Sequence, residues 1–315
     1  MTNRPYPAGS PPRISVVVVS YRRHDEIRHC LRDLARQSTD VPFEIVLVLQ
    51  DYPTPIADQI VTDFGDAVPL TVYRTNRGLG VHAARNVGIE RARGEIIAFL
   101  DDDVRAKSDW IATLWDAYAD ASVGGVGGFV EHPGNRRISI RMLRPLLGLS
   151  AHRYRIDWGG FHALPWSSHP PSDQDADWLS GCNMSFRRVA LEQVGGFDEG
   201  YGLYGYDDVD IGLRVRQAGW RLISSRRLTV QHFPSALNRA KLPDLVRDEE
   251  ARRVRFVRRA IGHLTGWRVR YVARLVCHLP ALLLQGLARG CPTLPFRALA
   301  GARRGMAQFG RGART

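Results

Sequence analysis

The chain has 315 residues, of which 44% are hydrophobic and 24% are charged. This composition is typical of a folded globular protein and excludes a disordered, collagen-like or coiled-coil chain. The net charge of +12 comes from the end of the chain, because residues 251–315 contain 14 Arg and no Lys, Asp or Glu. Residues 1–250 hold the other 30 basic residues and all 32 acidic ones, so a nearly neutral body carries a cationic tail.

No pattern of cysteines or apolar residues points to disulfides, zinc or a membrane span. The four cysteines form neither a CxxC pair nor a Cys/His cluster with zinc spacing, so we expect buried, reduced thiols. Residues 1–12 are polar and rich in Pro, and we expect a flexible lead-in rather than a secretory signal. The apolar run 275–288 is interrupted by His, Pro and Gln and predicts a surface-lying or re-entrant segment.

The first hundred residues alternate between short apolar runs and segments with helical spacing or a Gly-rich start. The predicted elements are strands at 14–19, 43–49, 68–73 and 95–100, and helices at 25–37 and 78–92. This alternation predicts an α/β fold with a mixed, mostly parallel sheet flanked by helices, joined by right-handed crossovers.

The rest of the chain is irregular before it becomes helical. Residues 131–177 show little periodicity and predict a long, functional loop region with one helix at 143–149. The elements expected beyond it are a helix at 207–218, strands at 220–224 and 228–232, and mostly helices from 246 onward. The predicted organisation is a flexible segment 1–12, an α/β domain 13–240 and an Arg-rich helical tail 241–315.

Three adjacent carboxylates, Asp101, Asp102 and Asp103, follow the predicted strand at 95–100. Their mutual repulsion is costly unless a cation or solvent offsets it, and ligands bind at the carboxyl edge of open α/β sheets. Mg²⁺ and Mn²⁺ take hard oxygen ligands and commonly share phosphate oxygens with a substrate. These residues therefore indicate a divalent metal that holds a nucleotide diphosphate, with a solvated acidic turn or a helix cap as the alternative.

A second acidic group, Asp207, Asp208 and Asp210, opens the predicted helix at 207–218. Acidic residues are expected in a first helical turn, and Asp210 can pair with Arg214 four residues on. The preceding loop is rich in Gly, however, which is typical of permissive backbone around a pocket. One of two adjacent carboxylates could then act as a base while the other binds an acceptor hydroxyl.

Two weaker signals complete the set. His232 ends the last predicted strand; a lone His is more often structural, and it becomes a candidate metal ligand only if it converges on Asp103. The Gly-rich turn 76–80 precedes the helix that holds Arg85, and such turns can present backbone N–H groups to an anion.

In this order, the signals resemble those of the family 2 glycosyltransferases, which have the GT-A fold. The resemblance covers residues 13–235 and rests on five segments followed by His232. The segments are SVVVVSYRR, EIVLVLQD, TNRGLGVHAARNVGIERARGEIIAFLDDDV, WLSGCNMSFRRVALEQVGGFDE and YGYDDVDIGLRVRQAGWRL. The resemblance implies an enzyme that transfers a sugar from a nucleotide donor, usually with inversion at the anomeric carbon.

Matched position by position, the resemblance implies a role for each candidate. Asp208 is implied as the catalytic base, and Asp103 as the main ligand of Mn²⁺ or Mg²⁺, with His232 as a second ligand. Acceptor contacts are expected at Asp207 and Trp178. Nucleotide contacts are expected at Ser20, Tyr21, Arg23, Asp51, Arg85, Asp101 and Asp102.

Two positions depart from the family's pattern. Asp51 is followed by Tyr52 and Pro53 rather than by a small polar turn, so the surroundings of the expected base contact differ. The acid pair is Asp207–Asp208 rather than Glu-Asp, and the shorter first acid changes the expected contacts to acceptor hydroxyls.

The acceptor side is expected in the loop region 131–177. Its aromatic residues, among them Trp158, suit sugar rings, and its Arg residues suit phosphate or carboxylate groups. Packing of these aromatic residues on the body is the equal alternative.

In the tail, Arg next to aromatic and apolar residues favours an anionic membrane surface over a helical cap or an oligomer contact. Nucleic acid is the least expected partner of the tail.

We therefore expect an inverting transferase that moves a sugar from a UDP- or dTDP-linked donor to a lipid-linked or cell-envelope glycan acceptor. We expect the protein in the cytoplasm, either free or peripheral on the inner face of the cell membrane. The alternative is a catalytically inactive GT-A-like module that binds membrane or nucleic acid through its tail. A nucleotidyltransferase has no support, because no basic, Gly-rich signature follows the first strand.

Overall fold

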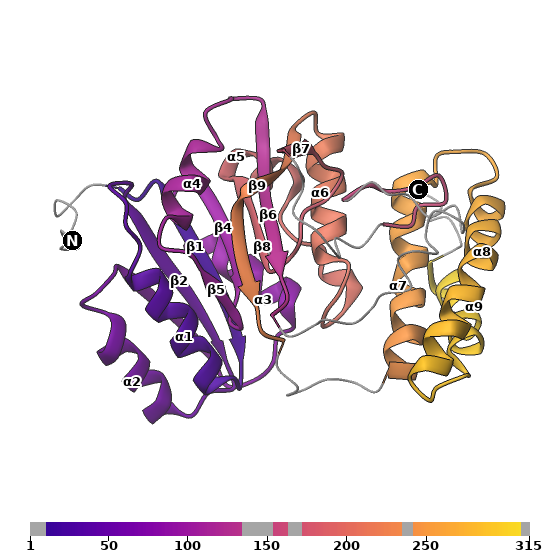
Figure 1. Cartoon of the computed structure of the whole chain (residues 1–315), viewed down its shortest axis with the longest axis horizontal. Helices are drawn as coiled ribbons and strands as arrows, with labels where there is room; N and C mark the ends of the chain where they lie inside the picture. The colour runs from indigo at the N-terminus through magenta and orange to yellow at the C-terminus, as the bar shows by residue number, and fades with distance from the viewer. Residues whose placement is uncertain (1–10, 134–153, 163–171, 235–241, 310–315) are drawn as a thin grey trace. The chain divides into compact units, whose positions relative to one another are not determined.

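The computed structural model describes residues 11–133, 154–162, 172–234 and 242–309 (Figure 1). The chain divides into two units. One, here called the sheet unit, comprises residues 1–136 and 165–235, and the other, the helical unit, comprises residues 137–164 and 236–315. The described segment 154–162 thus groups with the C-terminal helices. The predicted helix at 143–149 lies outside the described residues.

The sheet unit alternates strands and helices in chain order. Its elements are β1 (Ile14–Tyr21), α1 (His24–Ala35), β2 (Phe43–Gln50), α2 (Thr54–Phe64), β3 (Leu70–Thr75), α3 (Val81–Arg91), β4 (Ile96–Asp101), β5 (Val104–Ala106), α4 (Trp110–Asp116), β6 (Val123–Glu131), β7 (Gln174–Asp175), β8 (Asn183–Arg187), α5 (Arg188–Val194), a 3-10 turn (Glu199–Tyr201), α6 (Asp207–Gln217) and β9 (Arg221–His232).

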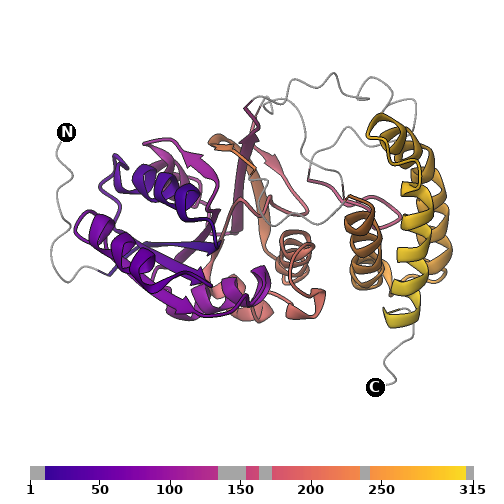
Figure 2. The same ribbon diagram turned by 90° about the horizontal axis from the view of Figure 1, so that it is seen from below.

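The strands form one mixed sheet in the order β3-β2-β1-β4-β8-β6-β9-β5, with β7 paired to β9. The first four are parallel, whereas β8 is antiparallel to both of its neighbours. Right-handed crossovers place α1 and α2 on one face of the sheet and α3 on the other, where α5 and α6 also lie (Figure 2). The expected α/β class with a mostly parallel sheet is confirmed.

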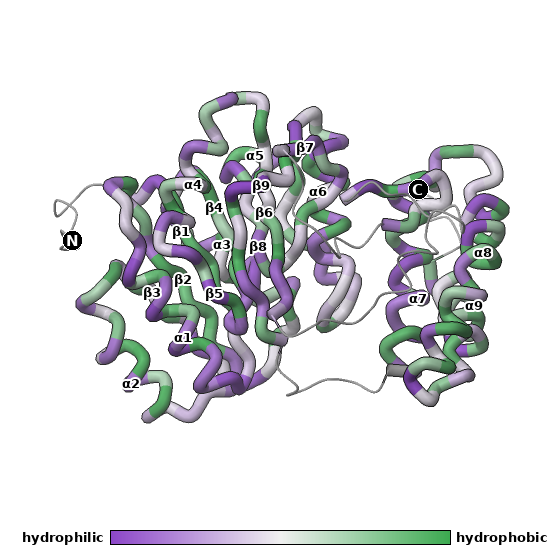
Figure 3. Tube along the Cα trace, in the orientation of Figure 1, coloured by the Kyte–Doolittle hydropathy of each residue, from purple (hydrophilic) through white to green (hydrophobic). Residues whose placement is uncertain are grey.

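The parallel strands form where the sequence has continuous apolar runs. Every residue of β2 is buried, as are Ile14–Val18 of β1 and the first five residues of β4. Strands covered by helices on both faces require such runs, and Figure 3 shows hydrophobic residues concentrated along them. The predicted strands at 14–19, 43–49 and 95–100 are therefore confirmed.

Strand β6 is one of several elements that the sequence analysis did not predict. Its four Gly lower strand propensity, but they also let neighbouring groups approach closely. A Cβ at Gly128 would lie 1.6 Å from the carbonyl oxygen of Leu228. The β6–β9 register shifts at this point, between Gly128 and Phe129, so the two strands predicted at 220–224 and 228–232 are one irregular strand, β9.

Strand register determines which side chains meet at the carboxyl edge of the sheet. Pairing of β1 with β4 sets Val19 beside Asp101. Antiparallel pairing of β5 with β9 sets His232 beside Val104, immediately after Asp103. Two segments far apart in the chain are thereby joined at the end of β4.

The helical unit contains α7 (Leu242–Ile261), α8 (Trp267–Ala288), α9 (Leu294–Phe309) and the segment 154–162. Arg274 of α8 donates to Asp157 at 2.6 Å, and the guanidinium groups of Arg253 and Arg274 lie 4.3 and 4.7 Å from the centre of the Phe161 ring. Among the described helices, α8 alone is long and apolar enough to cross a membrane by length and composition. It is longer than the run 275–288 expected from the sequence.

We predict that Gly88→Ala destabilises the sheet unit. Alanine raises helix propensity by about 1 kcal/mol, but its Cβ would lie 2.3 Å from Cγ1 of Val17, and overpacking costs about 1–3 kcal/mol. Thermal unfolding measures the loss. The Gly88→Ala/Val17→Ala double variant should lose less than the sum of the single variants, and strict additivity would contradict the predicted contact.

Candidate active site

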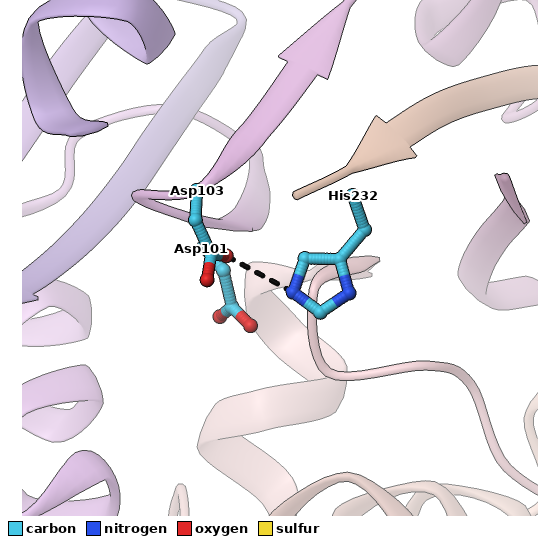
Figure 4. A group of neighbouring side chains, drawn as sticks. All are labelled: Asp101, Asp103 and His232. Carbon is cyan, nitrogen blue, oxygen red and sulfur yellow. Dashed lines mark ion pairs between the residues drawn. The ribbon is translucent and has the colours of Figure 1, made fainter. Parts of the chain in front are cut away.

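Asp101, Asp103 and His232 converge at the carboxyl edge of the sheet (Figure 4). One ligand atom from each lies within 4.8 Å of the others, and His232 Nε2 is 3.0 Å from Oδ1 of Asp103. His232 therefore converges on Asp103, which is the condition for counting it as a candidate metal ligand. Two carboxylates and an imidazole are a donor set that suits a divalent cation such as Mn²⁺ or Mg²⁺.

The charge of Asp103 controls the protonation of His232. Burial alone would lower the pKa of His232, but the hydrogen bond to Asp103 and the charge of that carboxylate raise it above the ordinary value. The ring of His132 lies 5.3 Å away, edge-on to that of His232. Burial and the charge of His232 lower the pKa of His132, so the second imidazole is neutral at physiological pH.

Asp102 is turned toward the end of β1. It accepts hydrogen bonds from Ser20 Oγ at 2.5 Å and from Arg23 Nη1 at 2.7 Å, and burial raises its pKa to about 7. Arg23 also donates to Asp103 at 3.0 Å, so one guanidinium bridges two of the three carboxylates. These contacts are between residues expected to bind nucleotide, and they bring Ser20, Arg23 and Asp102 together.

Strained backbone marks the ends of β1 and β2. Arg22 and Asp51 have φ of 56° and 55°, a region that residues other than Gly rarely occupy, and Arg22 Nε donates to Asp51 at 2.6 Å. Tyr21, just before Arg22, is half-buried, and a Cβ on Gly78 would lie 3.3 Å from its ring. Strained residues of this kind gather at ligand sites because the surrounding structure must hold them.

Arg85 of α3 connects the end of β4 to the start of α6. Its buried guanidinium forms an ion pair with Asp207 and donates to Asp101 at 3.1 Å and to the carbonyl oxygen of Gly181 at 2.8 Å. Asp207, expected to contact the acceptor, is therefore buried against Arg85.

Asp208 is linked to Arg85 through the backbone of Gly181. The Gly181 N–H donates to its Oδ2 at 3.1 Å, and the Val209 N–H donates to its Oδ1 at 2.8 Å. Burial nevertheless raises the pKa of Asp208 above the ordinary Asp value. Tyr206, just before α6, has φ of 63° and turns the chain into the helix.

The expected aromatic acceptor residues are separated between the two units. Trp178 is buried in the sheet unit, where a Cβ on Gly212 would lie 2.7 Å from its Cα. Trp158 is 53% exposed and belongs to the helical unit. Most of the predicted loop region 131–177 lies outside the described residues.

Two contributors were not predicted from the sequence. Tyr52 Oη lies 2.5 Å from Ser20 Oγ and accepts from the Arg23 N–H at 3.1 Å. Gly181 joins Arg85 to Asp208 through its backbone alone. The departure from a small polar turn after Asp51 was the sequence feature that could have indicated Tyr52. Gly181 acts through its backbone, so no side chain in the sequence indicates its role.

We predict that Arg85→Met lowers the free energy of unfolding by about 3–5 kcal/mol, because it leaves two carboxylates without their buried partner. The matched variant Arg13→Met breaks the exposed pair with Glu95 and should cost less than about 1 kcal/mol. Chemical denaturation of both variants measures the difference. Equal losses would show that Arg85 is not essential to the buried connection.

Comparison with known proteins places these residues in context. A family model described as glycosyl transferase family 2 matches residues 15–195, and one described as the N-terminal domain of galactosyltransferase matches residues 167–237. A glucosyl-dolichyl phosphate glucuronosyltransferase of Haloferax volcanii is 26% identical, over 70% of this chain and 69% of that protein. An O-antigen biosynthesis protein of Myxococcus xanthus is 27% identical over 75% of this chain, but the match spans only 18% of that protein.

Solved structures share the fold. A mannosyltransferase of Pyrobaculum calidifontis, in complex with GDP-Man and Mn²⁺, has a TM-score of 0.59 at 20% identity, over 97% of this chain and 91% of that chain. S. aureus TarS 1–349, in complex with UDP-GlcNAc, has a TM-score of 0.55 at 15% identity, over 96% of this chain and 93% of that chain. These likenesses confirm the GT-A type of α/β fold.

Proposed function

The chain belongs to glycosyl transferase family 2, and from this premise we propose that it transfers a sugar from a UDP- or dTDP-linked donor to a hydroxyl acceptor with inversion. The observation that carries the proposal is the connection through Arg85 and Gly181. Arg85 holds Asp101 and the Gly181 carbonyl, while the Gly181 N–H holds Asp208. Asp101, which belongs to the proposed metal site, and the proposed base Asp208 are thus held relative to each other, as a two-substrate transfer requires.

The donor diphosphate is proposed to bind at Asp101, Asp103 and His232. These residues fit a divalent cation because three ligand atoms of suitable chemistry converge there. When bound, Mn²⁺ or Mg²⁺ supplies positive charge beside the diphosphate oxygens of the leaving group. Mn²⁺ in the complex of the Pyrobaculum mannosyltransferase supports this assignment without deciding between the two metals.

Asp208 is proposed as the catalytic base. Its carboxylate accepts the proton of the acceptor hydroxyl as that oxygen forms a bond to the anomeric carbon. The bond from the anomeric carbon to the diphosphate oxygen breaks in the same step, and its electron pair leaves with the nucleoside diphosphate. One displacement without a covalent intermediate inverts the anomeric configuration.

The acceptor is proposed to be a lipid-linked or cell-envelope glycan. The Haloferax relative acts, by its name, on a glucosyl-dolichyl phosphate, and the Myxococcus relative takes part in O-antigen biosynthesis. In the sheet unit, Asp207 and Trp178 remain the proposed acceptor residues, with Asp207 acting beside Arg85. Trp158 of the helical unit stays a prediction from the sequence alone.

We predict that nucleotide binding requires metal and Asp103. Calorimetric titration with UDP, dTDP and GDP, with and without Mn²⁺, should show metal-dependent binding of UDP or dTDP. Asp103→Ala should weaken this binding at least tenfold, roughly the range for losing a group that supports a metal. Asp58→Ala, which removes an exposed carboxylate of α2, is the control and should bind normally. A folded protein that binds no nucleotide would favour the inactive module instead.

We predict that Asp208→Asn lowers kcat by about 10²–10⁴ while donor binding is kept. In the wild type, kcat should fall as the pH decreases, because the base must be ionised. Burial raises the pKa of Asp208, so the midpoint should lie above about 3.9, the usual Asp value. Steady-state kinetics against pH checks both points, with Asp58→Asn as the control. A product with retained anomeric configuration by NMR would contradict the single displacement.

A further inference from the structure

One face of α8 is exposed and entirely apolar. Every exposed residue from 271 to 288 belongs to it, and none is polar. The members, here called the α8 face, are Val272, Ala273, Val276, Cys277, Pro280, Leu283, Leu284, Leu287 and Ala288. Their spacing of three and four residues keeps them on one side of the helix, and Val269, 72% exposed, extends the same stripe.

The opposite side of α8 packs on its own unit. Tyr271 donates to the buried Glu250 of α7 at 2.8 Å, and Leu282 packs against Leu294 and Ala298 of α9. At Gly286 an added Cβ would lie 2.3 Å from the carbonyl oxygen of Cys291, so the contact is close. Among the described residues, α8 therefore has one partnered face and one exposed face, a pattern typical of an interaction surface.

The flanks of the α8 face are cationic. At 100° per residue, Arg268 and Arg270 project on either side of the stripe, and Arg289 follows its far end. Residues 251–315 contain no acidic residue, so the segment that carries α8 is strongly cationic. A second copy docked face to face would bring Arg against Arg, whereas anionic lipid headgroups complement this rim.

We propose that the α8 face docks into the headgroup region of an anionic phospholipid bilayer, with α8 parallel to the membrane plane. The surface is independent of the nucleotide and sugar that the sheet unit uses. Insertion of one apolar face with an Arg rim is the arrangement of interfacial amphipathic helices.

A transmembrane orientation of α8 conflicts with its partners. Although its length and composition suffice for a span, α7 is joined to it by the Tyr271–Glu250 hydrogen bond and carries Arg and acidic residues along its length. A span would draw those charges into the hydrocarbon core, where ionised side chains are very costly. Docking parallel to the surface leaves them in water.

Vesicle flotation of the full chain tests the docking. Binding to vesicles of equal parts phosphatidylcholine and phosphatidylglycerol should be roughly tenfold or more tighter than to phosphatidylcholine alone. Val276→Asp should weaken binding about tenfold. The matched control is Val189→Asp on α5, because Val189 and Val276 are 53% and 56% exposed. If the Val276→Asp variant binds vesicles as the wild type does, the proposal is overturned. It is also overturned if the only effect of Val276→Asp is to dissociate a dimer in solution.

Depth and orientation are measured by a fluorophore on Cys277. Cys30 and Cys182 are buried, so a Cys291→Ser background leaves Cys277 as the reactive thiol. The emission of an attached nitrobenzoxadiazole should shift to the blue with anionic vesicles, and alkaline carbonate should release the protein. Carbonate-resistant protein would indicate a span and contradict surface docking, as would an unshifted emission with vesicles bound.

Three further readouts separate this proposal from the alternatives. Arg268→Gln/Arg270→Gln should remove most of the preference for anionic lipid; an unchanged preference would contradict the proposed role of the rim. Val276→Asp should bind UDP or dTDP with Mn²⁺ as the wild type does, so failure of docking and failure of the transferase are distinguishable. Binding of duplex DNA in preference to vesicles would instead assign the tail to nucleic acid and overturn the proposal.

Discussion

The repulsion between three consecutive carboxylates, residues 101–103, is the constraint around which the sheet unit is arranged. Each carboxylate is given a different set of partners by a different part of the fold. Arg85 comes from α3 on one face of the sheet, Arg23 from the end of β1, and His232 from the end of β9. Strand register and helix placement therefore meet at one cluster of charge. Ser20 completes it by donating a short hydrogen bond to Asp102, and Tyr52 in turn is hydrogen-bonded to Ser20.

Much of this fold is readable in the sequence because the parallel strands are buried on both faces. A continuous apolar run such as FEIVLVL is too apolar for a loop and too short for a buried helix, and β2 lies where this run predicts a strand. Strand β6 is different, since its Gly residues are favourable only through the close approach of β9. That approach is set by tertiary packing and leaves no local pattern.

The residues of the candidate site also differ in whether the local sequence can predict them. Asp101, Asp103 and Asp208 are marked by residue type and by their position at the end of a strand or the start of a helix. The meeting of His232 with Asp103 depends on the pairing of β5 with β9, across more than a hundred residues of chain. Local propensity cannot specify such pairing. The role of His232 as a second ligand is therefore implied by the family resemblance and not by residue spacing. Neither residue spacing nor the family resemblance predicted the backbone role of Gly181.

Residues 154–162 have a consequence for the order in which the protein is made. They are synthesised between β6 and β7, yet Asp157 and Phe161 find their partners on α7 and α8, as far as 117 residues downstream. A nascent chain can complete its sheet once β9 has left the ribosome, but this segment must wait for the tail. Until then Phe161 lacks the two guanidinium groups that cover its ring. A chain that ends before α7 would therefore keep Phe161, buried in the finished protein, without the partners that cover it.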